Sequence, residues 1–252
     1  MENIWTEEFP VRTWDVDRTG RLHAAAAFNY FQEIAGNHAE ALGVGKAPLA
    51  ATGHAWILSR MTAVILRRSG WGETLNARTW PRGTDRLFAV RDYELLDSDS
   101  EIVGRGRSGW IVLDTEKMRP VRPGFLTDSI PLNEGRDAVP DGIGSLESFP
   151  DLEPVGSRDS AYSDIDYNGH VNNARYVQWI QDALPREALE NSAGYRIDVN
   201  YLSEVKPGAS VDFFCGQRKR TGNDGAEYSF YAFEGRHRDG GQPSFRAEIR
   251  LF

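Results

Sequence analysis

The pattern of hydrophobic and polar positions divides the chain into two halves of similar order. In the first half, residues 9–16 are rich in strand-forming residues, and residues 17–20 carry a turn signal. Between residues 23 and 42, hydrophobic side chains recur at spacings of three and four, which predicts an amphipathic helix. That stripe consists of Ala24, Ala27, Phe28, Phe31, Ala35, Ala39 and Leu42.

Strand-like segments follow the predicted helix after a loop at residues 47–53. They lie at residues 56–66, 74–80, 87–96 and 102–113, with turn-forming sequences between them. Consecutive strands joined by short turns predict an antiparallel sheet, because a parallel sheet requires alternating strands and helices.

The second half repeats this order after a proline-rich stretch at residues 119–154. The pattern predicts a short strand, a polar turn, a helix and further strands, at residues 158–162, 164–170, 172–184, 195–202, 210–217, 227–234 and 244–252. We therefore predict an α+β protein with units at residues 1–125 and 156–252, joined by a surface linker at residues 126–155.

The two halves align as an internal repeat, with residues 15–28 matching residues 164–177. The alignment pairs Asp17 with Asp166, Thr19 with Asn168, Gly20 with Gly169, Arg21 with His170, and Arg68 with Glu204. Residues with a structural role should be present in both copies of the repeat, as the aspartate and the glycine are. The other three polar residues of the second copy are absent from the first, which favours a catalytic second half and a binding first half.

Three interpretations of the second-half turn remain to be weighed. A calcium loop fits its opening, but the twelfth position is Arg175 where a bidentate glutamate is needed. A structural interpretation makes the Asp and Asn residues turn and cap formers, with a hydrogen-bonded histidine. An active site is the third: Asp166, Asn168 and His170 would point to one face of an extended segment. A helix N-terminus follows, whose free N–H groups can stabilise an oxyanion.

Charge and cysteine content narrow the class of protein. The 252 residues include 29 basic and 37 acidic side chains, a formal net charge of -8, which argues against a nucleic-acid or anionic membrane partner. The lone Cys215 cannot form an internal disulfide, and the N-terminus lacks a signal-peptide pattern. We therefore predict a soluble cytoplasmic protein. No set of ligating residues suggests a metal or organic cofactor, so none is expected.

Residues 163–179, SDIDYNGHVNNARYVQW, closely resemble the signature D-x-D-x-N-x-H-V-N-N-x-x-Y of the plant and bacterial acyl-acyl-carrier-protein (acyl-ACP) thioesterases. The stretches FPVRTWDVDRTGRL, FNYFQEIAGNHAEALG, WILSRM and VNYLSEVKPG resemble the same family, so the likeness covers nearly the whole chain. It implies a double hotdog fold, in which each half wraps an antiparallel sheet around one long helix. It also implies hydrolysis of fatty acyl-ACP thioesters to free fatty acid, which ends fatty acid synthesis.

The resemblance places Asp166, Asn168, His170 and Glu204 on the family's catalytic positions. Plant members carry a cysteine directly after that glutamate, where this chain has Val205, so we hypothesise attack by water. Glu204 and His170 would activate the water, Asn168 would orient it or polarise the carbonyl, and Asp166 would fix the histidine or the loop. The N–H groups of residues 171–173 would hold the oxyanion, and we expect Asn172 to be the helix N-cap.

The acyl chain is expected in the first half, on apolar residues that could equally be ordinary core. These residues are Phe28, Phe31, Ile34, Trp56, Ile57 and Met61. The partner implied by the family is an acidic acyl carrier protein, for which a basic patch would be needed. Candidates for that patch are Arg67, Arg68, Arg218, Lys219 and Arg220.

Two alternatives to this function stay open: the same chemistry on acyl-coenzyme A, and a hotdog protein that binds acyl chains without catalysis. We also allow for a homodimer. Neither chain-length preference nor the division of labour between Glu204 and His170 follows from the sequence.

Overall fold

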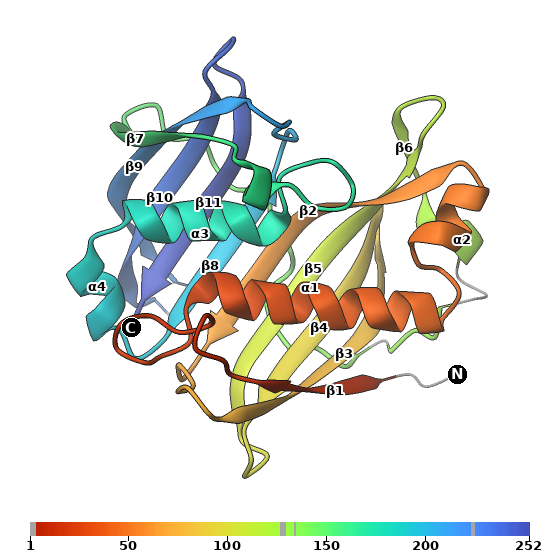
Figure 1. Cartoon of the computed structure of the whole chain (residues 1–252), viewed down its shortest axis with the longest axis horizontal. Helices are drawn as coiled ribbons and strands as arrows, with labels where there is room; N and C mark the ends of the chain where they lie inside the picture. Colours follow the sequence, from red (N-terminus) through yellow and green to blue (C-terminus); the bar gives the residue numbers. More distant parts are fainter. Residues whose placement is uncertain (1–3, 127–129, 134, 223–224) are drawn as a thin grey trace. The chain divides into compact units, whose positions relative to one another are not determined.

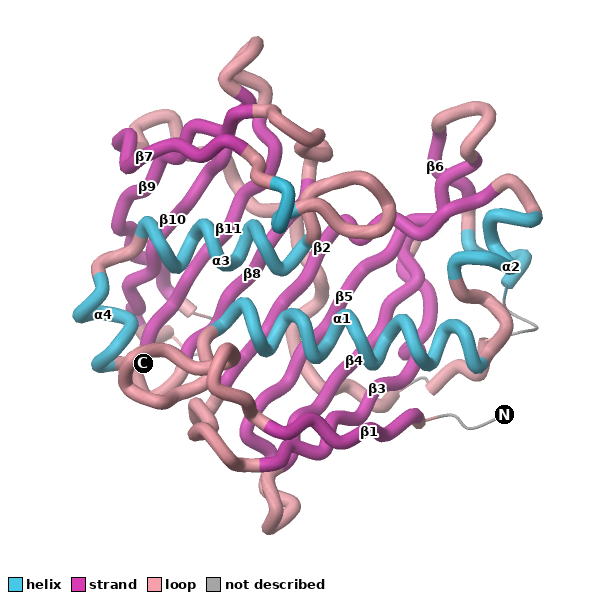
Figure 2. Tube along the Cα trace, in the orientation of Figure 1, coloured by secondary structure: helices cyan, strands magenta, loops and turns pink. Residues whose placement is uncertain are grey.

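The computed structural model describes residues 4–126, 130–133, 135–222 and 225–252. The chain divides into a first unit, residues 1–143, and a second unit, residues 144–252. In each unit, one long helix lies across one face of an antiparallel sheet, α1 in the first and α3 in the second (Figures 1 and 2). The α+β arrangement predicted for each half is confirmed.

The first unit has the strand order β1-β3-β4-β5-β2, with all neighbours antiparallel and β6 added on β5. Its elements are β1 (Trp5–Pro10), α1 (Ala24–Ala41), α2 (Lys46–Ala51), β2 (His54–Ile65), β3 (Thr74–Asp85), β4 (Phe88–Leu96), β5 (Ile102–Asp114), β6 (Arg119–Val121) and the 3₁₀ turn η1 (Pro123–Leu126).

The second unit has the order β8-β11-β10-β9-β7, again antiparallel throughout. Its elements are β7 (Glu153–Asp159), the 3₁₀ turn η2 (Tyr162–Asp164), α3 (Asn173–Ala183), α4 (Arg186–Asn191), β8 (Tyr195–Tyr201), β9 (Ser210–Thr221), β10 (Glu227–His237) and β11 (Pro243–Leu251).

The structure differs from the predicted elements mainly at short segments. The first strand is β1, which ends where the predicted strand of residues 9–16 was only beginning. The short helices α2 and α4 were not predicted. Pro185 is the N-cap residue of α4 and makes no side-chain capping bond; proline fits there because this position supplies no N–H to the hydrogen bonds of the helix. Strand β7 begins earlier than residue 158 and includes Pro154, which an edge strand can accommodate.

Helix α1 has four alanines in its first turn and packs on a strand, β5, that carries glycine opposite Phe31. A methyl group at Gly106 of β5 would lie 3.0 Å from the ring of Phe31, so a larger residue there would require the ring to shift by a few tenths of an ångström. Phe31 also packs against Tyr93, with ring centroids 4.9 Å apart. The apolar stripe of α1 thus forms the centre of the first unit.

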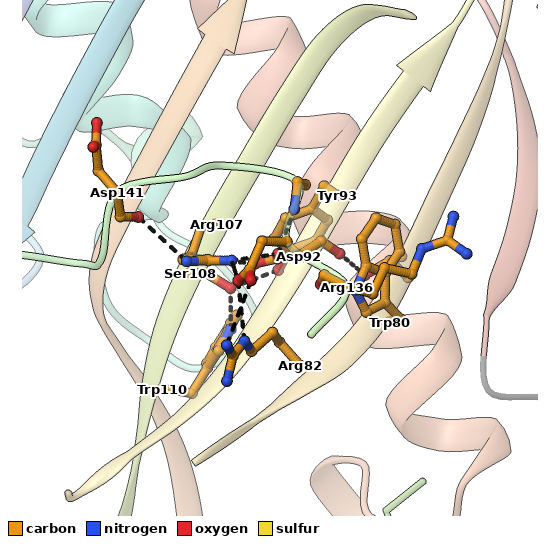
Figure 3. Close-up of polar contacts among 12 residues, drawn as sticks. Trp80, Arg82, Asp92, Tyr93, Arg107, Ser108, Trp110, Arg136 and Asp141 are labelled. Carbon is orange, nitrogen blue, oxygen red and sulfur yellow. Dashed lines mark hydrogen bonds and ion pairs between the residues drawn. The ribbon is translucent and has the colours of Figure 1, made fainter. Parts of the chain in front are cut away.

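The predicted linker at residues 126–155 includes residues 127–129 and 134, which lie outside the described residues. Residues 135–143, here called the strap, lie on the first unit (Figure 3). Trp80 donates its indole N–H to the carbonyl of Arg136 at 3.0 Å, and the N–H of Ala138 donates to Asp92 at 2.8 Å. Arg107 donates to the carbonyl of Asp141 at 3.2 Å.

A buried ion pair fastens the strap to the sheet. Arg107 and Asp92 are directly opposed on β5 and β4, and two hydrogen bonds of 2.6 and 2.7 Å join them. Because Gly106 faces α1, its neighbour Arg107 faces the other side of the sheet, where the strap lies. Asp137 of the strap is a second partner of Arg107, and hydrogen bonds from Arg82 and Arg107 lower the pKa of Asp137.

Candidate active site

The second-half polar motif forms a tight turn, here called the second turn (residues 164–172). The N–H of Asp166 donates to the carbonyl of His170 at 2.9 Å, and the N–H of Gly169 donates to the carbonyl of Asp166 at 3.0 Å. Gly169 has a φ of 85°, which glycine adopts without strain. The prediction that three side chains share one face of an extended segment was therefore wrong; a reversal of the chain brings them together.

Asp166 holds this turn in shape. One carboxylate oxygen accepts from the backbone N–H of Asn168 at 2.7 Å and, more weakly, from that of His170 at 3.5 Å. The other accepts from the Asn168 side-chain amide at 3.3 Å. Among the described residues, no hydrogen bond joins Asp166 to the imidazole of His170. Of the two roles predicted for Asp166, its contacts match fixing the loop.

Glu204 meets His170 although 34 residues separate them in the sequence. It lies on the second loop (residues 203–208), and its Oε2 is 2.8 Å from Nε2 of the imidazole. The N–H of Val171 donates to the carbonyl of Val205 at 3.1 Å and ties this loop to the turn. The two side chains remain 40% and 48% exposed, so a substrate can reach them. The structure brings all four predicted polar residues to one place.

Helix α3 begins directly after the second turn, and Asn172 caps it as predicted. Its side-chain oxygen accepts from the N–H of Ala174 at 2.9 Å. The prediction for the oxyanion donors was wrong at two of three positions. The N–H groups of Val171 and Asn172 already donate to the carbonyls of Val205 and Asp164. No described residue accepts from the N–H of Asn173, which remains available.

The first unit contains the same turn, here called the first turn (residues 15–23). Asp17 accepts from the N–H groups of Thr19 and Arg21 at 2.8 and 3.3 Å, and Gly20 has a φ of 75°. The N–H of Leu22 donates to the carbonyl of Ser69 at 2.8 Å, which matches the bond between the second turn and the second loop. These equivalent bonds confirm the register of the internal repeat.

The first turn replaces the His–Glu pair with a closed ion pair. Arg68 lies on the first loop (residues 67–72), at the position of Glu204, and donates to the carboxylate of Asp17. It also donates to the carbonyl of Leu22 at 3.1 Å. Its side chain is only 4% exposed, so the guanidinium makes its contacts within the protein.

The residues predicted to bind an acyl chain do not share one environment. The side chains of Phe28, Phe31, Ile34 and Met61 are buried in the first unit. Trp56 is half-buried and donates its indole N–H to the carbonyl of Val44 at 2.8 Å. Ile57 is 41% exposed, outside the core that holds the phenylalanines.

The basic residues predicted to receive a carrier protein all have carboxylate partners. Arg67 pairs with Glu73 and Asp97, Arg68 with Asp17, Arg218 with Asp151, Lys219 with Glu227, and Arg220 with Glu248. These five residues therefore do not form an uncompensated positive patch, because acidic groups neutralise each of them.

Cys215 is buried, and burial raises the pKa of its thiol. Within the described part of the chain, no group of three or more His, Cys, Asp or Glu side chains is arranged to hold a metal ion. The described helices include none long and apolar enough to cross a membrane. Sequence reasoning did not assign a role to Tyr176, although it is the last residue of the signature; its hydroxyl meets the second loop.

Two family models match the chain in order: the acyl-ACP thioesterase N-terminal domain over residues 2–124 and the C-terminal domain over residues 158–247. The chain is 27% identical over 226 residues to oleoyl-acyl carrier protein thioesterase 1, chloroplastic, of Arabidopsis thaliana, a match covering 82% of this chain and 62% of that protein. The chain thus spans about three fifths of the length of these curated relatives.

Solved structures give the same result. An acyl-ACP thioesterase from Bacteroides thetaiotaomicron is 27% identical, with a TM-score of 0.85 over 99% of this chain and 98% of that chain. The 12:0-ACP thioesterase from Umbellularia californica is 20% identical, with a TM-score of 0.82 over 100% and 98%, a likeness of fold alone. With the sheet-and-helix order of both units, these likenesses confirm the predicted double hotdog fold.

Proposed function

The chain belongs to the acyl-ACP thioesterase family, and from that membership we propose that it is a thiolester hydrolase acting on fatty acyl-ACP. The products would be free fatty acid and acyl carrier protein, which ends fatty acid synthesis. The observation that carries the proposal is the contact of 2.8 Å between His170 and Glu204, at the family's signature and beside a helix N-terminus. Activity, substrate and partner are all part of the proposal.

The attacking group would be water. Its oxygen bonds to the thioester carbonyl carbon while the Glu204–His170 pair takes its proton. The tetrahedral oxyanion then collapses, the carbon–sulfur bond breaks, and the pantetheine sulfur receives that proton. Cys215 is buried on β9, and the residue directly after Glu204 is Val205, so no thiol is placed beside the His170–Glu204 pair to act as the nucleophile.

Two neighbours of the pair would complete the site. The side-chain amide of Asn168 is exposed and lies on the same turn, where it would orient the water or polarise the carbonyl. The N–H of Asn173 at the start of α3 would donate to the oxyanion, with the helix dipole adding to its effect. Asp166 would act on both by keeping the second turn folded.

The acyl chain would bind in the first unit, against the buried side chains of α1 and β2. Phe28, Phe31, Ile34 and Met61 offer an apolar surface there, and Trp56 lies near the end of α1. Ile57 is part of the proposal but is exposed, so its contribution should be the smallest of the six. The depth of this apolar region would set the chain length.

The decisive experiment compares turnover of acyl-ACP and acyl-coenzyme A thioesters with one and the same acyl chain. We expect faster cleavage of the ACP thioester and release of free fatty acid. A preference for coenzyme A would reassign the substrate class. Binding of acyl chains without any cleavage would instead make the chain a non-catalytic hotdog protein.

A matched variant ties the activity to the site. His170→Ala should lose roughly 10²–10⁴ in kcat, the usual contribution of a positioned acid–base group. Arg21→Ala, at the equivalent position of the first turn, is the control and should retain activity. Full activity in His170→Ala would refute the assignment of the site.

A cytoplasmic location and a homodimer belong to the same proposal. The single, buried cysteine is compatible with a reducing compartment, whereas the plant relatives are named as chloroplastic. Cell fractionation would test the location, and sedimentation of the purified chain would test the oligomeric state.

A further inference from the structure

The hydroxyl of Tyr176 meets the loop that carries Glu204. The backbone N–H of Val205 donates to this hydroxyl at 3.1 Å. The carbonyl of Val205 accepts from the N–H of Val171 in the second turn at 3.1 Å. Both backbone groups of Val205 are therefore held. Its N–H belongs to the peptide group attached to Cα of Glu204, so holding that N–H limits rotation of the glutamate's backbone.

The ring of Tyr176 is itself fixed. Its side chain is 3% exposed on α3 and contacts three aromatic rings: Tyr201 and Phe245 edge-on, at 5.5 and 5.1 Å between centroids, and Trp179 tilted at 5.3 Å. Such packing leaves the ring no alternative rotamer, so its hydroxyl is a stationary acceptor. Burial, with smaller effects from the charges of Glu204 and Asp166, raises the pKa of Tyr176 to about 12. The phenol therefore stays protonated at neutral pH.

The first unit holds its equivalent loop in another way. In the register of the repeat, Ala27 occupies the position of Tyr176 and has no group that could reach the loop. There Arg68 holds the loop through its own side chain, bonded to Asp17 and to the carbonyl of Leu22. A residue used in this way is not available for chemistry. The second loop is held by a different residue, and this leaves the carboxylate of Glu204 to face His170.

We propose that Tyr176 is a positioning residue of the active site, which keeps the carboxylate of Glu204 against His170 by binding the peptide N–H of Val205. This inference rests on the proposed function. It assigns to the hydroxyl of the signature's final tyrosine a role in turnover in addition to the role of its ring in the core.

Tyr176→Phe tests the proposal, because it removes the hydroxyl and keeps the ring. We expect kcat on acyl-ACP to fall about tenfold, since small displacements of a catalytic group are costly, while KM stays within about twofold. Tyr30→Phe is the matched control. Tyr30 is a buried tyrosine of α1 whose hydroxyl donates to the carboxylate of Asp15 in the first turn at 2.9 Å. This variant should also lose stability but keep kcat within about twofold.

A double-mutant cycle separates positioning from a purely structural effect. If Tyr176 acts through Glu204, adding Tyr176→Phe to Glu204→Ala should lower the residual rate no further. An equal loss in both backgrounds, or a kcat for Tyr176→Phe equal to that of the unmodified chain, would overturn the inference while His170→Ala still reports on the proposed function. If the unmodified chain cleaves no thioester, the proposed function fails and this inference fails with it.

Discussion

The first and second turns have the same backbone hydrogen bonds but carry different side chains. Each has an aspartate that accepts from backbone N–H groups two and four residues ahead, a glycine with positive φ, and a bond to the following loop. In the first turn, Arg68 and Asp17 are 4% and 22% exposed, and their charges neutralise each other. In the second, His170 and Glu204 are 40% and 48% exposed and keep surface for a substrate.

On the proposed function, this difference assigns folding stability to one copy of the motif and catalysis to the other. A guanidinium bonded to a carboxylate and a carbonyl contributes to folding and offers nothing to a ligand. An imidazole beside an exposed carboxylate contributes little to folding, because solvent screens the pair, but it can move protons. Changes in the first turn should therefore alter the free energy of unfolding, and changes in the second should alter turnover.

The largest expected effect follows from Glu204→Gln, which keeps the shape of the side chain and removes its charge. We predict a loss of roughly 10²–10⁴ in kcat and a change in the free energy of unfolding within about 0.5 kcal/mol, as is usual for exposed positions. Steady-state kinetics and urea denaturation measure the two quantities. If Glu204→Gln lost stability but kept turnover, the second turn would have the structural role that we assign to the first.

Arg68→Met should have the opposite profile. The free energy of unfolding should fall by about 2–3 kcal/mol, less than for a fully buried pair because Asp17 keeps some exposure to water. The kcat of the folded fraction should stay within about twofold. Arg67→Met, whose guanidinium lies on the surface and pairs with Glu73, is the control and should cost less than about 1 kcal/mol. Equal costs for the two variants would contradict the buried role of Arg68.

Acid should remove the contribution of the Asp17 carboxylate to the free energy of unfolding. Burial alone would raise the pKa of Asp17, but hydrogen bonds from Thr19 and Arg68, with the charge of Arg68, lower it below the ordinary value of 3.8. Since the folded-state pKa lies below the unfolded one, the stabilisation is complete above about pH 3.8 and disappears as the pH falls through the folded-state pKa. The difference in unfolding free energy between the unmodified chain and Asp17→Asn should therefore shrink in acid. A difference that is constant with pH would contradict the ion pair.

The smallest expected effect is a loss of stability on replacing the turn glycine, and it should be equal in the two turns. Gly20→Ala and Gly169→Ala introduce a methyl group that meets no heavy atom within 4 Å, so the cost comes from positive φ alone. We predict about 1 kcal/mol for each. Turnover should fall only in Gly169→Ala, since only that glycine precedes His170. Thermal unfolding and kinetics of the two variants give the comparison directly, and unequal stability losses would show that the turns are not equivalent.

Periodicity sufficed to predict the long elements of this fold. The apolar stripe of α1 and the meander of β2 to β5 are local patterns, and the paired aspartates and glycines gave the correct register of the repeat. That register also indicated Glu204 as the counterpart of Arg68, before any contact with His170 was known. The family signature predicted Asp166, Asn168 and His170, and the resemblance of the segment VNYLSEVKPG added Glu204. The catalytic roles of these four residues stay a prediction.

Contacts between distant segments were the part that the sequence did not reveal. The N–H groups of Val171 and Asn172 looked available beside a helix start, but the carbonyls that occupy them come from Val205 and Asp164. The basic run at residues 218–220 looked like a positive patch, but Arg218 pairs with Asp151, whose position 67 residues away in the sequence hid the contact. The extended form expected for residues 166–170 could have been rejected on local grounds, because Asn168-Gly169 is a strong turn sequence.

The strap has a consequence for where the first unit ends as a folding unit. The family model for the N-terminal domain stops at residue 124, but Asp92 accepts from the N–H of Ala138 and Trp80 donates to the carbonyl of Arg136. A fragment cut at residue 124 would uncover a buried charge pair and a tryptophan that is 0% exposed, and it should aggregate. The smallest autonomous first unit therefore extends to about residue 143, the boundary at which the chain itself divides.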